Sequence, residues 1–564
     1  MFKKVLIVGG VAGGASAAAR VRRLDERAEI IMFEKSPHVS ISNCSLPYHL
    51  SGIVENSERL VLMNPEIFKN RYNIEARVNQ EVVQINREKK TIIVKDLVAA
   101  KMYEESYDHL VLSPGATPIR PNVEGINSPN VFTVRNVVDI ENINSYIKQN
   151  GIHDIAVIGG GFIGVEVAEN LKLAGYNVTL VEFANQVMTT FDYDMAQILH
   201  KEMIDHGVNL ILEDGLAKLS DGYVLTNSGK KIDAQAVVLA TGVKPETRLA
   251  EAAGLEIGET GAIKVDHNYV TSDSNIYAVG DAIEVYHRLL RKPTRLALAG
   301  PAQKQARVAA DHMYGIPSRN MGVIGSSSIH LFELNAASTG LNVKQAKQAG
   351  IMHDSVYLMP GDKVGLMPNS NPMHFKLIYE YPTGRILGAQ AIGKGNVDKR
   401  IDVVATIITM NGTLEDLKDL ELTYSPMLGT AKDVVNHAAL VGLNLLQGKY
   451  KEVKVSQVRD LIESNAFIID AREQAEYEAG HFKNAINIPL SEFRQRIDEI
   501  PKDQPVYIHC RSGQRSYNMV MALQGLGYEN IYNISGSYLG VNLYEYFNDI
   551  VTGRDKIVTE YNFK

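Results

Sequence analysis

The stretch that decides the fold is Ile155-Ala-Val-Ile-Gly159-Gly-Gly161-Phe-Ile-Gly164. The short apolar run Ile155–Ile158 predicts a buried strand, and Val165–Ala174 predicts a helix. Between them, a Gly-x-Gly-x-x-Gly pattern permits a tight turn and lets the backbone approach a pyrophosphate, whose charge the helix N-terminus stabilises. A second strand, expected at Asn177–Val181, ends at Glu182, where a carboxylate can accept hydrogen bonds from a ribose. Glycines that serve packing alone are the alternative, but the strand, the helix and the acid together favour a dinucleotide site.

The same order of elements opens the chain. Lys4–Val8 predicts a strand, Gly9–Gly14 a glycine turn, Ala15–Leu24 a helix, and Glu29–Phe33 a second strand that ends at Glu34. This loop has valine where the second fingerprint glycine belongs, so taken alone it leaves packing open as an alternative to a nucleotide. The two copies begin about 150 residues apart, which is too far for a solenoid repeat. They predict two Rossmann-like domains, which suggests one flavin and one nicotinamide placed for hydride transfer.

Composition narrows the possibilities further. The chain has 564 residues, which at roughly 150 per domain predicts three to four domains. A net charge of −7 argues against nucleic acid or an anionic membrane as a partner. No apolar run is long enough for a membrane span, and the run Val5–Val8 is too short for a signal peptide. The two cysteines, Cys44 and Cys510, cannot build a disulfide framework, so a reducing, cytoplasmic setting is expected.

Further strands are expected before residue 325. They are Ile92–Val94, His109–Leu112, Val237–Ala240 and Ile276–Val279, the last of which runs into Gly280-Asp281.

After about residue 325 the pattern changes. Antiparallel strands are expected at His374–Tyr379 and Ile386–Ala391, and helices at Val403–Met410 and Lys432–Leu446. The polar stretch Gln447–Val453 predicts a linker. A separate unit with a small parallel sheet is expected beyond it, from strands at Phe467–Asp470 and Val506–His509 and a helix from Ser516.

Residues 1–446 resemble the flavin disulfide reductases of the pyridine nucleotide–disulfide oxidoreductase superfamily. Two further motifs carry the resemblance, Ala240-Thr-Gly-Val-Lys-Pro245 and Tyr277-Ala-Val-Gly-Asp-Ala282. The resemblance implies an α/β protein with two Rossmann-like dinucleotide-binding domains and an α+β dimerisation domain, and hence a homodimer. The implied boundaries are 1–120 with 245–324 for FAD, 121–244 for NAD(P)H and 325–446 for dimerisation, followed by the linker 447–453 and a small domain at 454–564.

The resemblance also assigns cofactor contacts. Asp281 is expected to contact the ribityl chain of FAD, and Glu34 its adenosine ribose. The expected FAD-binding residues are Gly9, Gly10, Gly14, Glu34, Gly280 and Asp281, and the expected NAD(P)H-binding residues are Gly159, Gly161, Gly164 and Glu182. Because a carboxylate repels a 2′-phosphate and accepts a hydrogen bond from a 2′-hydroxyl, Glu182 favours NADH over NADPH.

The first cysteine stands in Ser40-Ile-Ser-Asn43-Cys44-Ser-Leu-Pro47-Tyr48. The glutathione-reductase branch has a Cys-x-x-x-x-Cys pair, but His49 occupies the partner position here, so no such dithiol can form.

A single thiol beside flavin has two uses in the superfamily. It cycles to sulfenic acid in NADH oxidases and peroxidases, or it forms a mixed disulfide with coenzyme A. The oxidase branch has a histidine in the first glycine loop, where this chain has Ala12. The Ser-x-x-Asn-Cys and Leu-Pro-Tyr pattern is similar to the coenzyme A-disulfide reductases.

Six residues are expected to bind coenzyme A. The resemblance implies that Ser40 and Asn43 contact the substrate. Arg20 and Arg23 lie three apart on one helical face and could neutralise its phosphates, with ordinary surface arginines as the alternative. Across the dimer interface, the segment with Tyr424 and the following Lys432 is expected to reach the partner's site, with interface packing as the alternative for Tyr424.

Two positions depart from the family pattern. Ser45 replaces a common glycine, and Leu366-Met367-Pro368-Asn369 stands where the family often has Tyr-Tyr-Pro-Gly. One of the two tyrosines expected near the thiol is therefore absent.

The second cysteine opens the loop Cys510-Arg511-Ser512-Gly513-Gln514-Arg515, between a strand and a helix. Such a loop aims several backbone N–H groups at one spot and, with the helix dipole and an arginine, favours a thiolate and a bound anion. Tyrosine phosphatases have Cys-x5-Arg, whereas this shorter Cys-x4-Arg loop resembles a rhodanese, whose cysteine carries a persulfide sulfur. The segment from Ile469-Asp470-Ala-Arg472 to Pro489 is similar to the rhodanese signature as well. A silent, regulatory rhodanese fold is the alternative, and the retained cysteine and arginine weigh against it.

Together the patterns resemble fusions of a coenzyme A-disulfide reductase with a rhodanese. They predict an FAD-dependent, cytoplasmic enzyme that reduces small disulfides and persulfides with NADH or NADPH, NADH being favoured, with coenzyme A as substrate or bound thiol and with no metal. In the expected cycle Cys510 or a small persulfide brings sulfane sulfur, and Cys44 attacks the carrier, expels hydrosulfide and forms a mixed disulfide with coenzyme A. An NADH oxidase or peroxidase, and a redox-sensing or sulfur-carrier protein without turnover, are the alternatives. Coenzyme A disulfide, coenzyme A persulfide and polysulfide all remain open as substrates.

Overall fold

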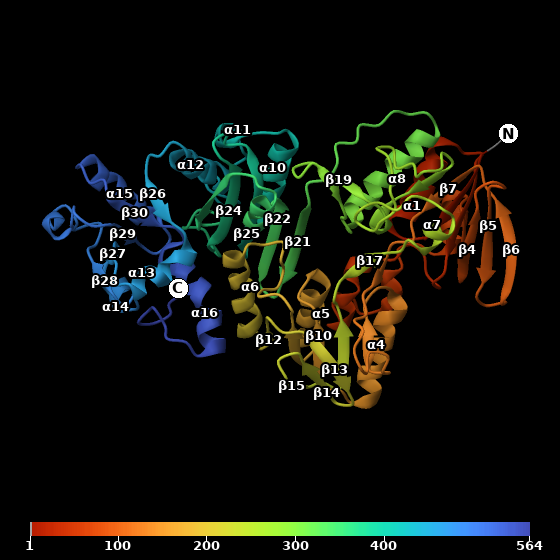
Figure 1. Cartoon of the computed structure of the whole chain (residues 1–564), viewed down its shortest axis with the longest axis horizontal. Coiled ribbons are helices and arrows are strands. Elements are labelled where there is room, and N and C mark those ends of the chain that lie inside the picture. Colours follow the sequence, from red (N-terminus) through yellow and green to blue (C-terminus); the bar gives the residue numbers. More distant parts are fainter. Residues whose placement is uncertain (1–2, 564) are drawn as a thin grey trace. The chain divides into compact units, whose positions relative to one another are not determined.

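The computed structural model describes residues 3–563, which fall into two compact units (Figure 1). The first unit holds the described residues up to Phe183 together with Asp214–Val323, and the second holds Ala184–Glu213 together with the described residues from Ile324 onward. The end of the first unit at Val323 lies beside the predicted boundary near residue 325. Residues 184–213, which the sequence assigns to the NAD(P)H domain, group with the second unit instead. Among the described residues, no helix is both long and apolar enough to cross a bilayer.

The first unit is built on a parallel sheet that begins with the N-terminal strand. Its order is β18-β7-β1-β2-β3, from β1 (Lys4–Val8), β2 (Glu29–Glu34), β3 (Glu75–Val78), β7 (His109–Leu112) and β18 (Ile276–Ala278). The central strands β1, β2 and β7 are largely apolar and buried because both faces of a parallel sheet are covered. Helices α1 (Ala12–Leu24) and α8 (Ala299–Met313) pack against each other, and Ala17 and Ala18 of α1 are fully buried.

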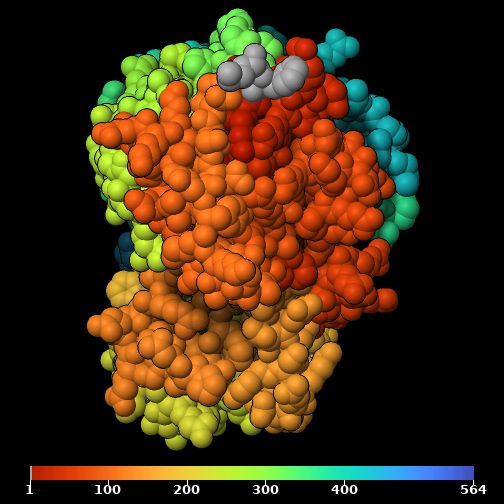
Figure 2. Space-filling model, turned by 90° about the vertical axis from the view of Figure 1, so that its right-hand side faces the viewer, coloured from red at the N-terminus to blue at the C-terminus, as the bar shows by residue number. Residues whose placement is uncertain are grey.

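A second parallel sheet in this unit repeats the βαβ order. Its strands β11, β10, β16 and β9 lie side by side in that order, at Asn177–Val181, Asp154–Ile158, Ala236–Leu239 and Val131–Thr133. Helix α4 (Val137–Asn150) precedes β10, and α5 (Phe162–Leu173) joins β10 to β11. Figure 2 shows one side of the molecule, with the red and orange N-terminal residues forming an upper body and lighter orange to yellow residues a lower one.

Smaller elements complete the first unit. Antiparallel strands form the sets β4 (Gln80–Asn86), β5 (Thr91–Asp96) and β6 (Lys101–Ser106); β13 (Leu216–Ser220), β14 (Tyr223–Thr226) and β15 (Lys231–Asp233); β8 (Ala116–Pro118) with β17 (Val243–Pro245); and β19 (Val285–His287) with β20 (Lys292–Thr294). Short helices are α2 (Pro47–Leu50), α3 (Pro65–Tyr72) and α7 (Arg248–Ala252), and 3-10 turns are η1 (Asn43–Ser45), η2 (Ser57–Leu60) and η3 (Gly280–Ala282).

The second unit contains an antiparallel sheet followed by a parallel one. The antiparallel sheet has the order β21-β22-β25-β24-β23, from β21 (Ser326–Leu331), β22 (Leu334–Gly340), β23 (His353–Leu358), β24 (Met373–Glu380) and β25 (Ile386–Gly393). Helix α10 (Val397–Thr409) packs on β22 and β25, and α12 (Val434–Leu446) packs on β23 and β24. The helices of this part are α9 (Val343–Gln348), α10 (Val397–Thr409), α11 (Leu414–Asp419) and α12 (Val434–Leu446). Helix α6 (Tyr193–Asp205) and the short strand β12 (Asn209–Ile211), from an earlier part of the chain, belong to the same unit.

The C-terminal parallel sheet has the order β26-β30-β29-β27-β28. Its strands are β26 (Lys451–Val453), β27 (Phe467–Asp470), β28 (Ala485–Asn487), β29 (Val506–His509) and β30 (Ile531–Ile534). Successive strand residues point to opposite faces, so Ile468 and Ile469 belong to two different hydrophobic cores. Around the sheet lie η4 (Val455–Gln457), η5 (Ile497–Glu499), α13 (Val458–Glu463), α14 (Gln474–Glu478), α15 (Gln514–Gly525) and α16 (Ser537–Thr552).

The predicted elements are present, with differences in their bounds. The helix expected at Val403–Met410 begins at Val397, and the helix expected from Lys432 begins at Val434. The helices after the glycine turns begin at Ala12 and Phe162, three residues earlier than expected, because the last glycine of each turn already lies in the first helical turn. The predicted linker is wrong for Lys451–Val453, which pair with β30 as an edge strand. Edge strands carry polar residues on their open side, so a short polar stretch such as Lys451–Val453 resembles a linker in sequence.

Candidate functional site

The two glycine turns have matching geometry. Gly9 and Gly159 adopt positive φ angles of +95° and +112°, and a Cβ on either would lie within 2.3 Å of a backbone oxygen. A Cβ on Gly14 would lie 1.8 Å from the Gly9 oxygen, and one on Gly164 would lie 1.9 Å from the Gly159 oxygen. Glycine is therefore needed at these four positions so that neighbouring backbone can pack closely. Close packing is the alternative to a nucleotide that the sequence left open for such glycines.

Gly161 differs from the other fingerprint glycines. A Cβ built on it would meet no atom within 4 Å, so the packing of the protein does not require glycine there. Gly161 caps the N-terminus of α5 in an extended conformation. The space in front of this helix end is thus open, which fits a pyrophosphate that lies against the backbone.

Each turn is closed by the acid at the end of the next strand. The N–H of Gly10 donates to Glu34 Oε2 at 2.9 Å, and the N–H of Ser36 donates to Glu34 Oε1 at the same distance. In the second lobe the N–H of Gly160 donates to Glu182 Oε2. The acid expected at the end of the second strand therefore lies beside the glycine turn in both lobes, and one of its oxygens accepts a hydrogen bond from that turn.

A third strand end joins the first lobe's site. Gly280 and Asp281 form η3 directly after β18, and the Gly280 N–H donates to Gln305 Oε1 at 2.7 Å. Gln305 is buried, and its Nε2 has no hydrogen-bond partner among the described residues. An unpartnered amide donor beside η3 fits an acceptor group of a bound cofactor.

The first thiol lies among carboxylates. Cys44 is exposed on η1. Partial desolvation raises the pKa of its thiol, and the negative charges of Glu166 on α5 and Asp281 on η3 raise it further. The chain thus brings together three segments far apart in sequence. Burial, followed by repulsion from Glu169, raises the pKa of Glu166 to about 7, so this carboxyl can hold or release a proton near neutral pH.

The predicted neighbours of Cys44 are placed around it in different ways. The side chain of Asn43 donates to the Arg135 carbonyl at 3.1 Å. Ser40 is nearly buried at a φ of +51°, and its N–H donates to the Gly10 carbonyl at 2.7 Å, which ties the thiol segment to the first glycine turn. Ser45, the residue that replaces a common glycine, shares a 2.8 Å hydrogen bond with Ser42.

The sequence did not single out Glu166 or Tyr48. Burial, followed by repulsion from Glu166, Glu169 and Cys44, raises the pKa of Tyr48 to about 12. A signal for Glu166 was available, because an acid two residues after Gly164 stands in the helical turn that faces the nucleotide site.

The two arginines expected to bind phosphates differ in their surroundings. Arg20 Nε donates to Asp311 Oδ1 at 2.6 Å, so its charge is compensated within the protein. Arg23 is exposed at the last turn of α1. Arg22 between them is buried and donates to backbone carbonyls, among them those of Tyr72 and Ala28.

Tyr424 and Lys432 lie in the second unit, on the segment between α11 and α12. Both are exposed, and Tyr424 has 51% of its surface accessible. The same segment exposes Met427 and Leu428, and Leu366 is exposed to 88%. Such an accumulation of exposed apolar side chains is typical of a protein interface.

The second thiol is enclosed by its loop. Cys510 follows β29 and is only 1% exposed. The N–H of Gly513 donates to its Sγ at 3.1 Å, and the hydroxyl of Ser516 lies 3.7 Å from the same atom. Arg515, in the first turn of α15, forms a bidentate ion pair with Glu476 at 2.6 and 2.7 Å. One backbone N–H, that of Gly513, and the hydroxyl of Ser516 therefore face the sulfur, and Glu476 is a partner of Arg515 that the sequence did not reveal.

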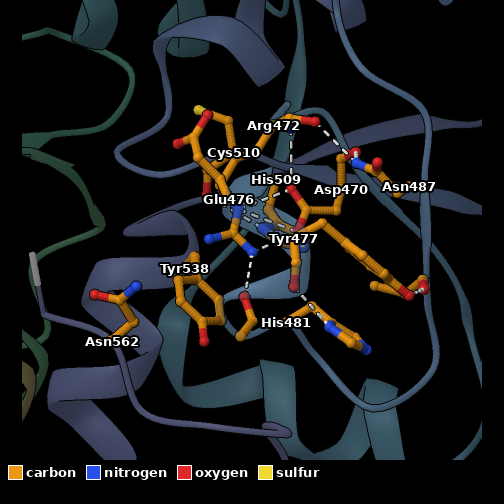
Figure 3. Close-up of polar contacts among 12 residues, drawn as sticks. Asp470, Arg472, Glu476, Tyr477, His481, Asn487, His509, Cys510, Tyr538 and Asn562 are labelled. Carbon is orange, nitrogen blue, oxygen red and sulfur yellow. Dashed lines mark hydrogen bonds and ion pairs between the residues drawn. The ribbon is translucent and has the colours of Figure 1, made fainter. Parts of the chain in front are cut away.

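A buried polar network supports this loop (Figure 3). Arg472 donates to both carboxylate oxygens of Asp470, at 2.9 and 2.6 Å, and to the Gly480 carbonyl at 2.7 Å. Its guanidinium lies 4.0 Å from the ring centroid of Tyr538. Burial lowers the pKa of His509 to about 4, with partial compensation from Asp470, so this histidine is neutral at neutral pH. The network joins the ends of β27 and β29 beneath Cys510.

Comparison with known proteins identifies the family. Residues 3–306 match the family described as pyridine nucleotide-disulphide oxidoreductase, and residues 326–434 match the dimerisation domain of that family. The chain belongs to the pyridine nucleotide-disulphide oxidoreductases. Residues 454–543 match the rhodanese-like domain, which confirms the assignment made from the Cys510 loop.

Two solved structures and one curated relative show how far the similarity extends. The chain is similar to reduced CoADR-RHD of Bacillus anthracis, with 42% identity over 97% of this chain and 98% of that chain and a TM-score of 0.94. It is also similar to an NAD-dependent persulfide reductase from A. fulgidus, with 34% identity over 95% of this chain and 99% of that chain and a TM-score of 0.90. The coenzyme A disulfide reductase of Staphylococcus epidermidis is 32% identical over 77% of this chain and 98% of that protein.

Membership of the family implies FAD and NAD(P)H as cofactors, and the chain has the features to hold them. In the first lobe, Glu34, Asp281 and the unpartnered amide of Gln305 provide acceptors and a donor around the first glycine turn. In the second lobe, the open space at Gly161 and the carboxylate of Glu182 fit a nicotinamide nucleotide. The chain is therefore an NAD(P)H-dependent flavoprotein reductase with a rhodanese-like domain.

Proposed function

We propose that this enzyme reduces coenzyme A disulfide and coenzyme A persulfide or polysulfide, with Cys44 as its redox-active thiol and Cys510 as a carrier of sulfane sulfur. The observation that carries the proposal is the isolation of Cys44. The chain has only two cysteines, and Cys510 is buried in a separate parallel-sheet domain with its sulfur held by its own loop. No second cysteine lies in the unit that holds Cys44, so a mixed disulfide there needs a thiol from outside that unit, and we propose that a small molecule supplies it. The similarity to a coenzyme A disulfide reductase and to a persulfide reductase supports coenzyme A thiols as that molecule.

The residues around Cys44 define its part of the reaction. The Cys44 thiolate attacks the coenzyme A sulfur of the persulfide and forms the Cys44–coenzyme A disulfide, while hydrosulfide leaves with the bonding electron pair. With coenzyme A disulfide the leaving group is coenzyme A thiolate. FAD, when bound, supplies a two-electron carrier between NAD(P)H and this disulfide. Glu166 can hold a proton near neutral pH and its charge acts on the Cys44 thiol, so we propose it as the proton donor to the departing thiolate.

Asn43 and Ser40 position the substrate arm in this proposal. The backbone of Ser40 is fixed by the first glycine turn, and the amide of Asn43 is fixed by Arg135. Arg23 provides an exposed cation for a phosphate, whereas the charge of Arg20 is already compensated by Asp311. Lys432 and Tyr424 are proposed to act from the partner subunit of a homodimer formed through residues 325–446, and a cytoplasmic location suits two unpaired cysteines.

The rhodanese-like domain is proposed to take sulfur from a persulfide. The Cys510 thiolate attacks the outer, sulfane sulfur, and the donor leaves as its thiolate with the bonding electron pair. The N–H of Gly513 and the hydroxyl of Ser516 face Cys510 Sγ, and we propose that these donors stabilise the persulfide formed there. The guanidinium of Arg515 compensates its negative charge.

The proposal is tested by anaerobic NADH oxidation with coenzyme A disulfide, coenzyme A persulfide and hydrogen peroxide in parallel. Turnover is expected with the first two and not with peroxide. Cys44→Ser should abolish both reactions while FAD content stays unchanged. Turnover with peroxide alone would instead show an NADH peroxidase.

NADH is the proposed reductant. The carboxylate of Glu182 lies beside the second glycine turn, where it would repel the 2′-phosphate of NADPH. We therefore expect a higher kcat/KM with NADH than with NADPH. Glu182→Ala should narrow this preference. A higher kcat/KM of the wild type with NADPH would contradict the assignment.

A further inference from the structure

The rhodanese-like domain is packed against the antiparallel sheet of the dimerisation domain. Val441 and Leu445 of α12 pack against the hydrophobic core around Cys510, and Asn444 of the same helix donates to the Tyr517 hydroxyl at 3.0 Å. Lys454, at the start of the domain, forms an ion pair with Asp354 of β23 at 2.9 Å. These contacts lie within one compact unit, so the junction is a packed interface and not a flexible tether.

The backbone around Cys510 is held by the first turn of α16. The N–H of Cys510 donates to the Ser537 hydroxyl at 3.2 Å, and the N–H of Tyr538 donates to the Cys510 carbonyl at 3.0 Å. The N–H of Leu539 donates to the carbonyl of Arg511 at 3.1 Å. Both peptide groups of the thiol residue thus depend on where this turn lies.

This turn lies against an aromatic side chain of the dimerisation domain. A Cβ on Gly536 would lie 3.1 Å from the ring of Tyr357, and a Cβ on Gly540 would lie 3.1 Å from the same ring atom. Gly536 has a φ of +77°, which favours glycine for its own reasons, but Gly540 lies inside a regular helix. The close approach of Tyr357 therefore leaves little room for a side chain at 540, and Met359 would be in ordinary contact at 3.7 Å.

The hydroxyl of Tyr357 has a buried partner of its own. It forms a 2.9 Å hydrogen bond with Nδ1 of His374 on β24. Burial, helped by the nearby cation of Arg511, lowers the pKa of His374 to about 4, so the pair stays neutral at neutral pH. Arg511 is the residue directly after Cys510, and its charge therefore also reaches this pair.

We propose that Tyr357 of the dimerisation domain is a positioning residue for the rhodanese thiol, acting through the Gly536–Gly540 turn. In this proposal the dimerisation domain helps to position the Cys510 loop. It supplies the surface against which the loop of Cys510 is set. The inference rests on the proposed role of Cys510 in sulfur transfer.

Four full-length variants test this inference: Tyr357→Phe, Tyr357→Ala, Gly540→Ala and the double variant Tyr357→Ala/Gly540→Ala. Sulfur transfer is measured with coenzyme A persulfide as donor and cyanide as acceptor, which takes the sulfane sulfur from Cys510 as thiocyanate. Tyr357→Phe keeps the ring and should stay within about twofold of the wild type. Tyr357→Ala should lower kcat by more than about tenfold, since misplacing a reacting group by 1 Å costs that much or more. Gly540→Ala should lower it severalfold.

The double variant separates a shared contact from two independent defects. With the ring removed, the methyl group of Gly540→Ala has space, so the double variant should be no slower than Tyr357→Ala alone. A second readout is the rate at which iodoacetamide alkylates Cys510 in a Cys44→Ser background. Loosening of the loop should raise this rate in Tyr357→Ala and leave it unchanged in Tyr357→Phe.

NADH-dependent reduction of coenzyme A disulfide is the control and should stay at the wild-type rate in all four variants. The inference is overturned if Tyr357→Ala transfers sulfur at the wild-type rate with unchanged alkylation, or if the two single defects multiply in the double variant. If the wild type itself transfers no sulfur through Cys510, the proposed function fails instead. Should Tyr357→Ala not fold, Tyr357→Phe should still transfer sulfur at nearly the wild-type rate and Gly540→Ala severalfold more slowly, and a wild-type rate in Gly540→Ala would overturn the inference.

Discussion

Replacing Gly161 by alanine should weaken NADH binding without disturbing the fold. The added methyl group meets no protein atom within 4 Å, and the residue already has an extended conformation that alanine adopts. The same methyl group would occupy the space in front of the N-terminus of α5, where the pyrophosphate is proposed to lie. Loss of one charge-assisted hydrogen bond to that group costs about 1.5–3 kcal/mol, which corresponds to roughly a tenfold to 150-fold higher KM for NADH.

The effect on stability should be small by comparison. Alanine is a poorer helix N-cap than glycine by about 1 kcal/mol, which lowers Tm by about 2–4 °C in a unit of this size. FAD content should not change, because the first lobe has its own glycine turn. The assay is steady-state kinetics with varied NADH, beside flavin absorbance and thermal unfolding of the same preparation.

Gly164→Ala is the matched control from the same motif. Its Cβ would lie 1.9 Å from the Gly159 oxygen, so the turn itself must shift and folding should fail or Tm should fall sharply. The reasoning is refuted if Gly161→Ala binds NADH like the wild type, or if it loses flavin while the KM for NADH is unchanged. Either result would mean that the open space at Gly161 is not the nicotinamide nucleotide site.

Three further outcomes are expected. Cys510→Ser should abolish sulfur transfer to cyanide but leave reduction of coenzyme A disulfide largely intact, as a coupled NADH assay shows; equal loss of both activities would contradict separate roles for the two thiols. Glu476→Gln releases Arg515 from its ion pair, so the ratio of kcat/KM for the dianion thiosulfate to kcat/KM for coenzyme A persulfide should rise. Tm should change little, because a partly exposed ion pair contributes only about 1 kcal/mol or less. An unchanged or lower ratio of the two kcat/KM values would contradict this. Glu166→Gln removes a negative charge that raises the pKa of Cys44. In a Cys510→Ser background, alkylation of Cys44 should therefore become fast at a lower pH than without this substitution. A shift to higher pH would contradict the assigned cause.

The parts of this structure that depend on local sequence could be predicted. The strands Lys4–Val8 and Asn177–Val181 have the expected bounds, because an apolar run followed by a glycine turn or an acid fixes them locally. The loop of Cys510 could be predicted for the same reason, since its residues are contiguous. The expected dinucleotide turns differ from the structure only in where their helices begin.

The parts that depend on distant residues could not. Arg20 was expected to be available for a phosphate, but Asp311, 291 positions away, compensates its charge. Gly540 looks like a weak point of a helix until Tyr357, nearly 200 positions earlier, is known to lie against it. Lys451–Val453 read as a linker because the pattern of an edge strand shows only when its partner β30 is known. In each case the decisive neighbour is brought close by the tertiary fold.

The central claim is that Cys44 forms a mixed disulfide with coenzyme A. It is tested most directly by mass spectrometry of the oxidised enzyme after incubation with coenzyme A disulfide and no NADH. The account predicts one coenzyme A per chain, located on the peptide that holds Cys44 and released when NADH is added. A sulfenic acid on Cys44 that a dimedone reagent traps, or coenzyme A found on Cys510 instead, would contradict it.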